Sequence, residues 1–348
     1  MITRWLTGSS RWRNWIAALA VSTASVVALV APEATVAHHN AARVEIQGHR
    51  GARGLLPEST LAGFEHALRL GVDILELDVG LSKDGVVVIS HDAKLNPELT
   101  RDADGQWLAG ERPALRSLTY AEIARYNVGQ ARPGSMVTKR FPDQAALKHA
   151  PIPRLRDLFA LTARAQASRV RFNIELKIRP GWPDVYAPPD VFADAVASVI
   201  ESAAVEDRVT IQSFDWRALV AMKVRLPAVR LAALSTQQPW FDNIRVGRAG
   251  ASPWTAGLDV DDFNASVPHM VKTLGVDEWS PNWRDLNAEN LKVARDLGLE
   301  VSVWTVNLRH QMGQVIELGV DSIITDYPDR LRAELVARKR PVPAPIEF

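Results

Sequence analysis

The sequence of 348 residues contains no cysteine. This absence excludes disulfide bonds, thiolate metal sites, a cysteine nucleophile and a lipid-modified N-terminal cysteine. An excess of charge of either sign is also lacking, because 41 Lys and Arg residues face 40 Asp and Glu residues. No basic run follows a helix or strand face, so nucleic acid is not a predicted partner. The length suits one large α/β domain or two small ones.

Long apolar runs are lacking except near the N-terminus. Three arginines in the first 13 residues precede an uncharged apolar run at 16–30, and small residues follow at 34–37. This order is typical of a secretory signal peptide, so residues 1–37 are predicted as one, with cleavage after Ala37. The alternative is an uncleaved anchor, although the run is short for a membrane span. The predicted location is the periplasm or the exterior of a bacterium, with residues 38–43 as a linker and no stable membrane span after cleavage.

The stretch at 74–92 holds acidic side chains inside a predicted buried strand. Residues 74–79 are apolar and β-prone except for Glu76 and Asp78, which lie two positions apart. Side chains two residues apart on a strand share a face, so the two carboxylates are expected side by side. A hard divalent cation would remove their repulsion. His91 follows the next predicted strand and brings an imidazole close by. The alternative is a solvated edge strand whose acids contact only water.

Strands and helices alternate along most of the chain. The predicted parallel strands begin at Val44, Ile74, Val170, Val209, Val229, Val276, Glu300 and Asp321. Eight strands alternating with helices predict an α/β fold, a (β/α)₈ TIM barrel over residues 44–338. A doubly wound open sheet is the alternative, but its glycine-rich loop after the first strand is absent.

Three segments are expected to lie outside this alternation. A less regular insertion follows the second strand at about 93–151. Residues 237–260 are expected to form a long loop, and Trp240 and Trp254 within it are candidates for one wall of a site. Residues 339–348, which are rich in proline, are expected to form a loose tail.

Polar residues gather at the predicted carboxyl ends of the strands, where the active site of a barrel lies. They are His49, Arg50, Glu76, Asp78, His91, Glu175, Lys177 and Trp304. The three carboxylates are predicted to hold one hard cation and to leave positions open for substrate. Arg50 and Lys177 are placed to bind an anion, and the two histidines supply an acid and a base near neutral pH. Together these groups predict metal-assisted cleavage of a phosphodiester.

Each of these residues also has a purely structural interpretation. The histidines would then be hydrogen-bonded packing residues, and Glu175 with Lys177 would form a solvated ion pair on one strand face. Trp304 either packs within the barrel or forms a pocket wall. Glu58 either is an acid favoured at a helix N-terminus or supports the site from behind.

With these residues in place, the chain resembles the glycerophosphodiester phosphodiesterase family. The matching segments, in the family's order, are His49-Arg50-Gly51, Pro57-Glu58-Ser59-Thr60, Glu76-Leu77-Asp78, His91-Asp92, Glu175-Leu176-Lys177, Ser213-Phe214 and Trp304-Thr305-Val306-Asn307. They span about 44–335, and their combination is specific although each piece alone is weak. One departure is visible, because the family usually has Asn where Ser59 stands. Ser59 or Thr60 is expected to cap the following helix, and Asn and Ser are both good caps, so little change is expected.

The resemblance implies one divalent cation, Ca²⁺ or Mg²⁺, on Glu76, Asp78 and Glu175. It implies His49 and His91 as general acid and base. The implied reaction is hydrolysis of glycerophosphodiesters, which are small-molecule substrates, to glycerol 3-phosphate and an alcohol. In the family the insertion after the second strand forms a small cap.

Two other functions stay open at this point. A barrel phospholipase acting on intact lipid would need an exposed apolar rim, and none stands out beyond the tryptophan-containing loop. A secreted binding protein for phosphorylated alcohols that has lost catalysis would lack a histidine or a carboxylate, and none is missing.

Overall fold

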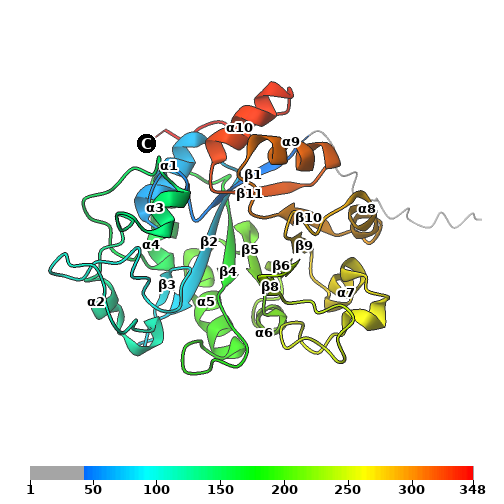
Figure 1. Cartoon of the computed structure of the whole chain (residues 1–348), viewed down its shortest axis with the longest axis horizontal. Coiled ribbons are helices and arrows are strands. Elements are labelled where there is room, and N and C mark those ends of the chain that lie inside the picture. The colour runs from blue at the N-terminus through cyan, green and yellow to red at the C-terminus, as the bar shows by residue number, and fades with distance from the viewer. Residues whose placement is uncertain (1–42, 348) are drawn as a thin grey trace, which may run out of the picture. The chain divides into compact units, whose positions relative to one another are not determined.

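Eight parallel strands form a closed barrel in the computed structural model, which describes residues 43–347 (Figure 1). They are β1 Glu45–His49, β2 Ile74–Leu81, β4 Arg171–Leu176, β5 Val209–Ser213, β6 Arg230–Ser235, β9 Glu278–Pro281, β10 Glu300–Val303 and β11 Ser322–Thr325. Their order is β1-β11-β10-β9-β6-β5-β4-β2, and pairing of β1 with β2 closes the ring. The predicted TIM barrel is therefore confirmed. The predicted signal peptide, residues 1–37, and most of the predicted linker lie outside the described residues.

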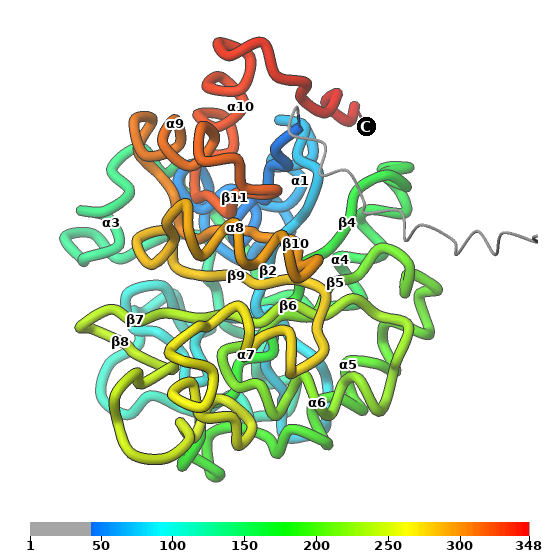
Figure 2. The backbone as a smooth tube through the Cα atoms, turned by 90° about the vertical axis from the view of Figure 1, so that its right-hand side faces the viewer, coloured from blue at the N-terminus to red at the C-terminus, as the bar shows by residue number. Residues whose placement is uncertain are grey.

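Helices surround the barrel and follow the strands in turn (Figure 1). They are α1 Leu61–Leu70, α4 Leu155–Arg164, α5 Pro189–Ala203, α6 Trp216–Arg225, α7 Val267–Leu274, α8 Ala288–Asp296, α9 Arg309–Leu318 and α10 Pro328–Ala337. Figure 2 shows α10 beside α1, so the first and last helices of the barrel are neighbours. Among the described residues, no helix has both the length and the apolar character needed to cross a membrane.

The start of α1 differs in one detail from expectation. The cap is Thr60, whose side chain accepts a hydrogen bond from the Gly63 amide at 3.1 Å. Ser59 instead has a positive φ of 59°, in the left-handed region. Asn adopts this region more readily than Ser. The Asn that is usual in the family therefore suits the backbone at this position, and capping is not the relevant property.

Residues 237–275 contain more regular structure than the sequence indicated. The expected loop includes a short hairpin, β7 Gln237–Gln238 and β8 Phe241–Asp242. A 3₁₀ turn at Val260–Phe263 and the eight-residue helix α7 follow, and neither was predicted. Helix α7 is short and has a proline at its second position, so its periodicity is hard to detect. Burial of Val267, Met270 and Val271 stabilises it through tertiary packing.

Alternation along the barrel strands separates an apolar layer from a polar interior. On β4, Phe172 and Ile174 are fully buried in the main hydrophobic core. Asn173 and Glu175, which alternate with them, point the other way. On β2, Leu75 and Leu77 belong to the same core. Each such buried side chain contributes roughly 1.5–3 kcal/mol relative to exposure. The core therefore lies between barrel and helices, which leaves the barrel interior free for polar groups.

The insertion after the second strand packs on the barrel at two places. Strand β3 Val87–Ile89 pairs antiparallel with β2 and precedes the insertion. A small separate core comprises Val88, Leu95, Leu115, Ile123 and Ile152. This small core includes residues of a 3₁₀ turn, Leu115–Ser117, and of helix α2, Tyr120–Ile123. A second cluster joins helix α3 Met136–Arg140 and Phe141 to Tyr327, just after β11. Through this cluster α3 lies beside the C-terminal end of the barrel.

The C-terminal segment after α10 lacks regular structure but is not loose within the described residues. Ile346 is buried, and its amide donates to the Leu68 carbonyl at 3.1 Å. The Arg332 guanidinium donates to the Pro343 carbonyl at 2.6 Å. The segment that was expected to be a loose tail is thus held at the N-terminal end of the barrel. A proline-rich composition prevents helix formation without preventing such contacts.

Candidate active site

A tight turn at the end of β1 positions the first two polar residues. Arg50 has a φ of 50°, and Gly51 has a φ of 90°. A Cβ on Gly48 would lie 2.3 Å from the Gly51 carbonyl oxygen, so only glycine fits. The turn directs the Arg50 amide to Oε2 of Glu76 at 3.0 Å. It thereby joins β1 to the acidic strand β2.

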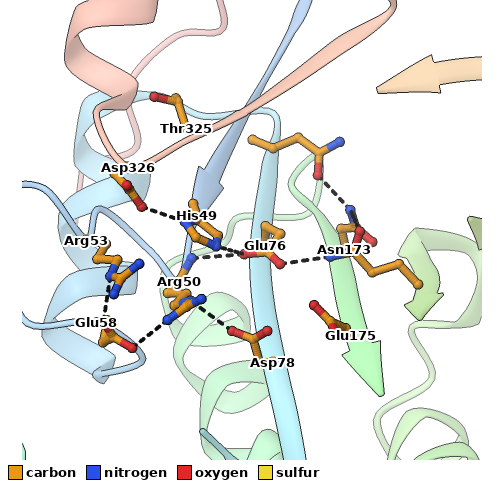
Figure 3. Close-up of polar contacts among 12 residues, drawn as sticks. His49, Arg50, Arg53, Glu58, Glu76, Asp78, Asn173, Glu175, Thr325 and Asp326 are labelled. Carbon is orange, nitrogen blue, oxygen red and sulfur yellow. Dashed lines mark hydrogen bonds and ion pairs between the residues drawn. The ribbon is translucent and has the colours of Figure 1, made fainter. Parts of the chain in front are cut away.

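Three carboxylates from two neighbouring strands converge at the barrel mouth (Figure 3). Glu76, Asp78 and Glu175 are all buried, and one oxygen of each lies within 4.8 Å of the others. Asp78 and Glu175 are direct register partners on β2 and β4, which explains the convergence. Oδ2 of Asp78 accepts no hydrogen bond from any described residue. Three carboxylate oxygens at this close spacing fit a hard divalent cation.

Two cationic side chains border the carboxylates. Nζ of Lys177 lies 2.8 Å from Oε1 of Glu175 and 3.4 Å from Oδ1 of Asp78. Nε of Arg50 lies 3.1 Å from Oδ2 of Asp78. With all five groups ionised, one negative charge is left in excess. A divalent cation would turn this into one positive charge, which suits an anionic phosphodiester.

The pKa values of the carboxylates reflect their crowding. Burial and the nearby charge of Asp78 raise the pKa of Glu76 well above its usual range. Burial raises the pKa of Glu175 to about 7, although Lys177 opposes the shift. Burial also disfavours ionised Asp78, but Arg50 and Lys177 outweigh it and hold the pKa of Asp78 below its usual range. The protein alone therefore does not favour three ionised carboxylates at this place.

Both histidines have a carboxylate partner at Nδ1. In His49 this atom lies 2.5 Å from Oδ1 of Asp326, and Nε2 lies 3.9 Å from Oε2 of Glu76. In His91 it lies 2.9 Å from Oδ1 of Asp92. When Nδ1 is held by a carboxylate, it carries the proton and Nε2 is left to exchange one.

Burial lowers the pKa of both imidazoles. Burial lowers the pKa of His49, and the charge of Asp326 opposes the shift. About a third of the His91 side chain is exposed. Even so, the surrounding protein, together with Arg50 and Lys177, lowers the pKa of His91 to about 4. Both histidines are thus neutral near pH 7 until an anion or a proton donor approaches.

Glu58 holds the Arg50 side chain from behind (Figure 3). Its Oε1 accepts a hydrogen bond from Nη1 of Arg50 at 2.8 Å, and its Oε2 lies 2.5 Å from Nε of Arg53. All three side chains are nearly buried. Glu58 therefore keeps the guanidinium of Arg50 oriented toward the carboxylates and does not itself line the cavity.

A chain of amide side chains crosses the barrel interior and ends at Glu76. Nε2 of Gln212 donates to Oε1 of Glu76 at 2.8 Å. Nδ2 of Asn173 donates to Oε1 of Gln212 at 3.0 Å and to Oε1 of Gln47 at 2.9 Å. Gln47 in turn donates to Oγ of Ser322 at 2.9 Å. The chain fixes the orientation of Glu76 from the barrel floor.

A cavity of about 430 Å³ opens above these groups. Both histidines, Lys177 and Arg50 line it, as do two of the three carboxylates, Glu76 and Glu175. Trp304 forms part of its wall, and its indole Nε1 donates to the Ser280 carbonyl at 3.0 Å. All eight strand-end residues singled out in the sequence are thus brought to one end of the barrel.

Sequence reasoning missed the partners that orient these residues. Asp326 and Asp92 hold the histidines, Gln212 holds Glu76, and Arg140 of α3 reaches to 4.0 Å from Asp326. The sequence did contain a signal for Asp326. Asp326 directly follows the last strand and His49 ends the first strand, and these two strands are neighbours in a closed barrel. Arg140 gave none, because it belongs to the irregular insertion.

Comparison with known proteins gives a consistent result. Residues 49–330 match the model of the glycerophosphoryl diester phosphodiesterase family. A glycerophosphodiester phosphodiesterase of Bacillus altitudinis is 30% identical over 289 residues, which is 82% of this chain and 96% of that protein. One of Bacillus subtilis is 28% identical over 296 residues, covering 82% and 85% of the two chains.

Solved structures show the same barrel. A protein of Silicibacter pomeroyi, provisionally described as a glycerophosphoryl diester phosphodiesterase, superposes with a TM-score of 0.76 at 34% identity, covering 86% of this chain and 95% of that one. An Oleispira antarctica phosphodiesterase in complex with the product sn-glycerol-3-phosphate superposes with a TM-score of 0.61 at 21% identity, covering 84% and 96%. The second likeness bears on the fold alone.

Proposed function

The chain belongs to the glycerophosphoryl diester phosphodiesterase family and is an enzyme that hydrolyses glycerophosphodiesters, and we propose that one divalent cation and two histidines carry the reaction. Ca²⁺ or Mg²⁺ is the proposed ion, because the ligands are carboxylate oxygens. The products are glycerol 3-phosphate and an alcohol. The supporting observation is the buried group of Glu76, Asp78 and Glu175, whose oxygens lie within 4.8 Å of one another beside a cavity that both imidazoles line.

The cationic side chains bind the phosphoryl group. When bound, the metal ion would supply positive charge that offsets the charge developing on the phosphoryl oxygens. Lys177 and Arg50 add two fixed positive charges at the same cavity wall. Glu58 and Asp78 hold the guanidinium of Arg50, so little reorganisation is needed when substrate binds. Trp304 presents an apolar face for the glycerol carbons.

The two histidines move the protons. In the proposed route, the glycerol 2-hydroxyl attacks phosphorus and gives its proton to Nε2 of one imidazole. The other ring, protonated to the imidazolium when the anionic substrate is bound, gives its Nε2 proton to the leaving alcohol as the bond to phosphorus breaks. Water then opens the cyclic phosphate with the two roles reversed. Asp326 and Asp92 hold the Nδ1 side of the two rings, so each ring exchanges its proton at Nε2.

The first test is release of glycerol 3-phosphate from purified protein and glycerophosphoglycerol. We expect EDTA to abolish release and added Ca²⁺ or Mg²⁺ to restore it. His49→Ala and His91→Ala should each lower kcat by about 10²–10⁴-fold. Exposed His269→Ala serves as the matched control. Activity that resists EDTA would count against the metal, and near-normal turnover of either histidine variant would remove that residue from the chemistry.

Metal affinity should depend on pH, which gives a second test of the ligands. Burial raises the pKa of Glu175 to about 7, so below that pH the cation has to displace a proton. We expect Ca²⁺ affinity to rise about tenfold from about pH 6 to about pH 8, with proton release in titration calorimetry. Glu76→Gln should weaken binding at every pH, whereas exposed Glu289→Gln should not. An affinity that is independent of pH would reject protonated Glu175 as the competitor.

We also propose that the protein is exported, on the strength of the N-terminal arginines and the apolar run at 16–30. Cleavage after Ala37 would remove that run. Mass spectrometry of protein from the producing cells is the test, and an intact Met1 would contradict it. The lipid-phospholipase alternative has no comparable support, because the exposed tryptophans line a cavity beside the site. The inactive-binder alternative is not favoured, because every proposed catalytic residue is present.

A further inference from the structure

A second cavity, of about 590 Å³, adjoins the first on the side of His91. We call it the aromatic lobe, and its aromatic lining residues are Trp182, Tyr186, Phe214, Trp240, Phe241, Trp254 and Trp304. Edge-to-face contacts join Trp254 to Phe241, Phe241 to Phe214, and Phe214 to Trp304, with ring centroids 4.9–5.2 Å apart. These contacts make one continuous, packed wall that runs outward from the reaction centre.

The two cavities meet at the reaction centre. His91, Glu175 and Lys177 line both of them, whereas His49 lines only the first. Three rings, Phe214, Trp240 and Trp304, also line both. A phosphodiester has two arms that leave phosphorus in different directions, so each cavity is placed to take one arm. This argument rests on the proposed function.

The chemistry of the walls distinguishes the two arms. The first cavity has polar lining residues that the aromatic lobe lacks, namely Arg53, Arg140, Asn282 and Arg284. These donors suit the hydroxyls of the small glycerol arm. The aromatic lobe is larger and offers ring faces, which suit a bulkier arm with an apolar face. The alcohol arm is the one that varies among glycerophosphodiesters.

The charges of the aromatic lobe oppose a positively charged alcohol. Lys94, Arg112 and Arg179 line only this lobe, and within residues 43–347 none of them forms an ion pair. Of the lining acids, Asp92 is held by His91 and Glu175 by Lys177. The guanidinium of Arg179 lies 4.9 Å from the ring centroid of Trp182. It therefore occupies a face of the indole that could otherwise bind a substrate cation. A quaternary ammonium would therefore meet like charge.

We infer that the aromatic lobe binds the alcohol arm of the substrate and selects a bulky, ring-bearing alcohol without positive charge, such as a cyclitol, over a quaternary ammonium alcohol. Ring faces contact the apolar side of the alcohol, and the basic rim donates hydrogen bonds to its hydroxyls. Wild-type kcat/KM should thus be highest for glycerophosphoinositol, lower for glycerophosphoglycerol and lowest for glycerophosphocholine.

Substitutions at the exposed rim test this order. Trp182 is 47% exposed on the loop after β4, so its removal does not open the core. Trp182→Ala should lower kcat/KM for glycerophosphoinositol about tenfold and for glycerophosphoglycerol less than about threefold. The control is Trp107→Ala, because Trp107 also carries an arginine, Arg101, at 5.6 Å but lines neither cavity.

Charge reversal tests the second part of the inference. Arg179→Glu should raise the ratio of glycerophosphocholine to glycerophosphoinositol hydrolysis about fivefold, and high salt should reduce the change. Exposed Arg125→Glu, which lines neither cavity, should leave the ratio unchanged.

Product inhibition shows which arm the lobe holds. Glycerol 3-phosphate contains only the glycerol arm, so its inhibition constant should change less than about twofold in Trp182→Ala. A weaker inhibition by glycerol 3-phosphate, or an equal loss for all three substrates, would overturn the inference while release of glycerol 3-phosphate upheld the proposed function. Absence of that release from every substrate with wild-type protein would instead reject the proposed function.

Discussion

Asp326 holds the ring of His49 in one tautomer, and its charge is what does so. Oδ1 lies 2.5 Å from Nδ1 of His49, and Oδ2 accepts a hydrogen bond from Asn307 at 2.6 Å. Asp326→Asn keeps the shape but presents an amide that can donate to Nδ1, which moves the ring proton to Nε2. We expect kcat to fall about 10²–10⁴-fold with KM little changed, as measured by release of glycerol 3-phosphate.

Two controls separate this effect from a loss of fold. Asp207→Asn removes an exposed carboxylate that lines neither cavity and should behave as wild type. The unfolding midpoint of Asp326→Asn should stay close to that of the parent. A pH–rate profile of unchanged shape and height would show that Asp326 has no part in orienting His49.

Ser59 carries a backbone conformation that suits a different residue. Its φ is 59°, and its buried hydroxyl has no hydrogen-bond partner among the described residues. Asn adopts this region at lower cost, so Ser59→Asn should raise the free energy of unfolding by about 0.5 kcal/mol. Ser59→Val should lower it, because a β-branched side chain is strained there. Denaturant unfolding at fixed temperature measures both, and a destabilised Asn variant would contradict the backbone argument.

At this scale, local periodicity made some of the site predictable. The two-residue spacing of Glu76 and Asp78 is enough to place both on one strand face. Residues that act at a strand end are likewise visible when the strand is strongly apolar, as for Glu175. Sequence spacing did not identify the roles of Asp326, Gln212 and Arg140. Those roles depend on which strands and loops meet in space, and the spacing of residues along the chain does not contain that information.

At the scale of single elements, strand β9 starts with a buried carboxyl at the barrel floor. Burial raises the pKa of Glu278 to about 7, and its Oε1 accepts a hydrogen bond from the Ser302 hydroxyl. In the unfolded chain the same group titrates near its ordinary value. Between that value and about pH 7 the unfolded chain therefore binds fewer protons than the folded one. The free energy of unfolding should fall as pH rises through this window and level off above it.

Glu278→Gln should remove this fall in the free energy of unfolding with rising pH. The variant should match the parent at about pH 4.5 and exceed its free energy of unfolding at about pH 8 by up to about 3 kcal/mol. Urea unfolding of both proteins across the range gives the difference curve. Exposed Glu289→Gln is the matched control, and parallel curves for Glu278→Gln and parent would show that this carboxyl is not protonated in the folded protein.

Elements were predictable where the apolar pattern was long and bounded by capping residues. Helix α9 Arg309–Leu318 is of this kind, because Gly319 follows its last residue in the left-handed conformation that ends a helix. Helix α7 and the hairpin β7–β8 were not predicted, because they are short and depend on packing against the barrel. Strand β9 begins at Glu278 rather than at Val276, since the run of Val276-Asp277 belongs to the preceding turn.

For the whole molecule, the C-terminal segment stabilises the fold at the end opposite the active site. Its contacts are Ile346 with the main core and the Ile346 amide with the Leu68 carbonyl. Deleting residues 341–348 should lower the free energy of unfolding by about 2 kcal/mol and leave kcat unchanged. Ile346→Ala in the full chain should account for most of the loss, with exposed Glu347→Ala as control. A reduced kcat at full stability would instead connect this segment to the site.

The overall fold was predictable because eight strong strands alternate with helices, and few topologies accept that order. The insertion was recognisable only as an interruption. The insertion packs on the barrel through the small core around Leu115 and through the cluster around Phe141. These contacts, with β3 and with Tyr327, leave no periodic pattern in the sequence.

The barrel can close only after its last strand has been synthesised. Strand β1 pairs along one edge with β11, with Glu45 opposite Ser322 and Gly48 opposite Thr325. On the ribosome, the β1 edge of a growing chain stays unpaired until nearly the whole chain has been synthesised. A vacant strand edge invites pairing with other chains. The β1 edge is therefore open to aggregation until β11 has been made and the barrel can close.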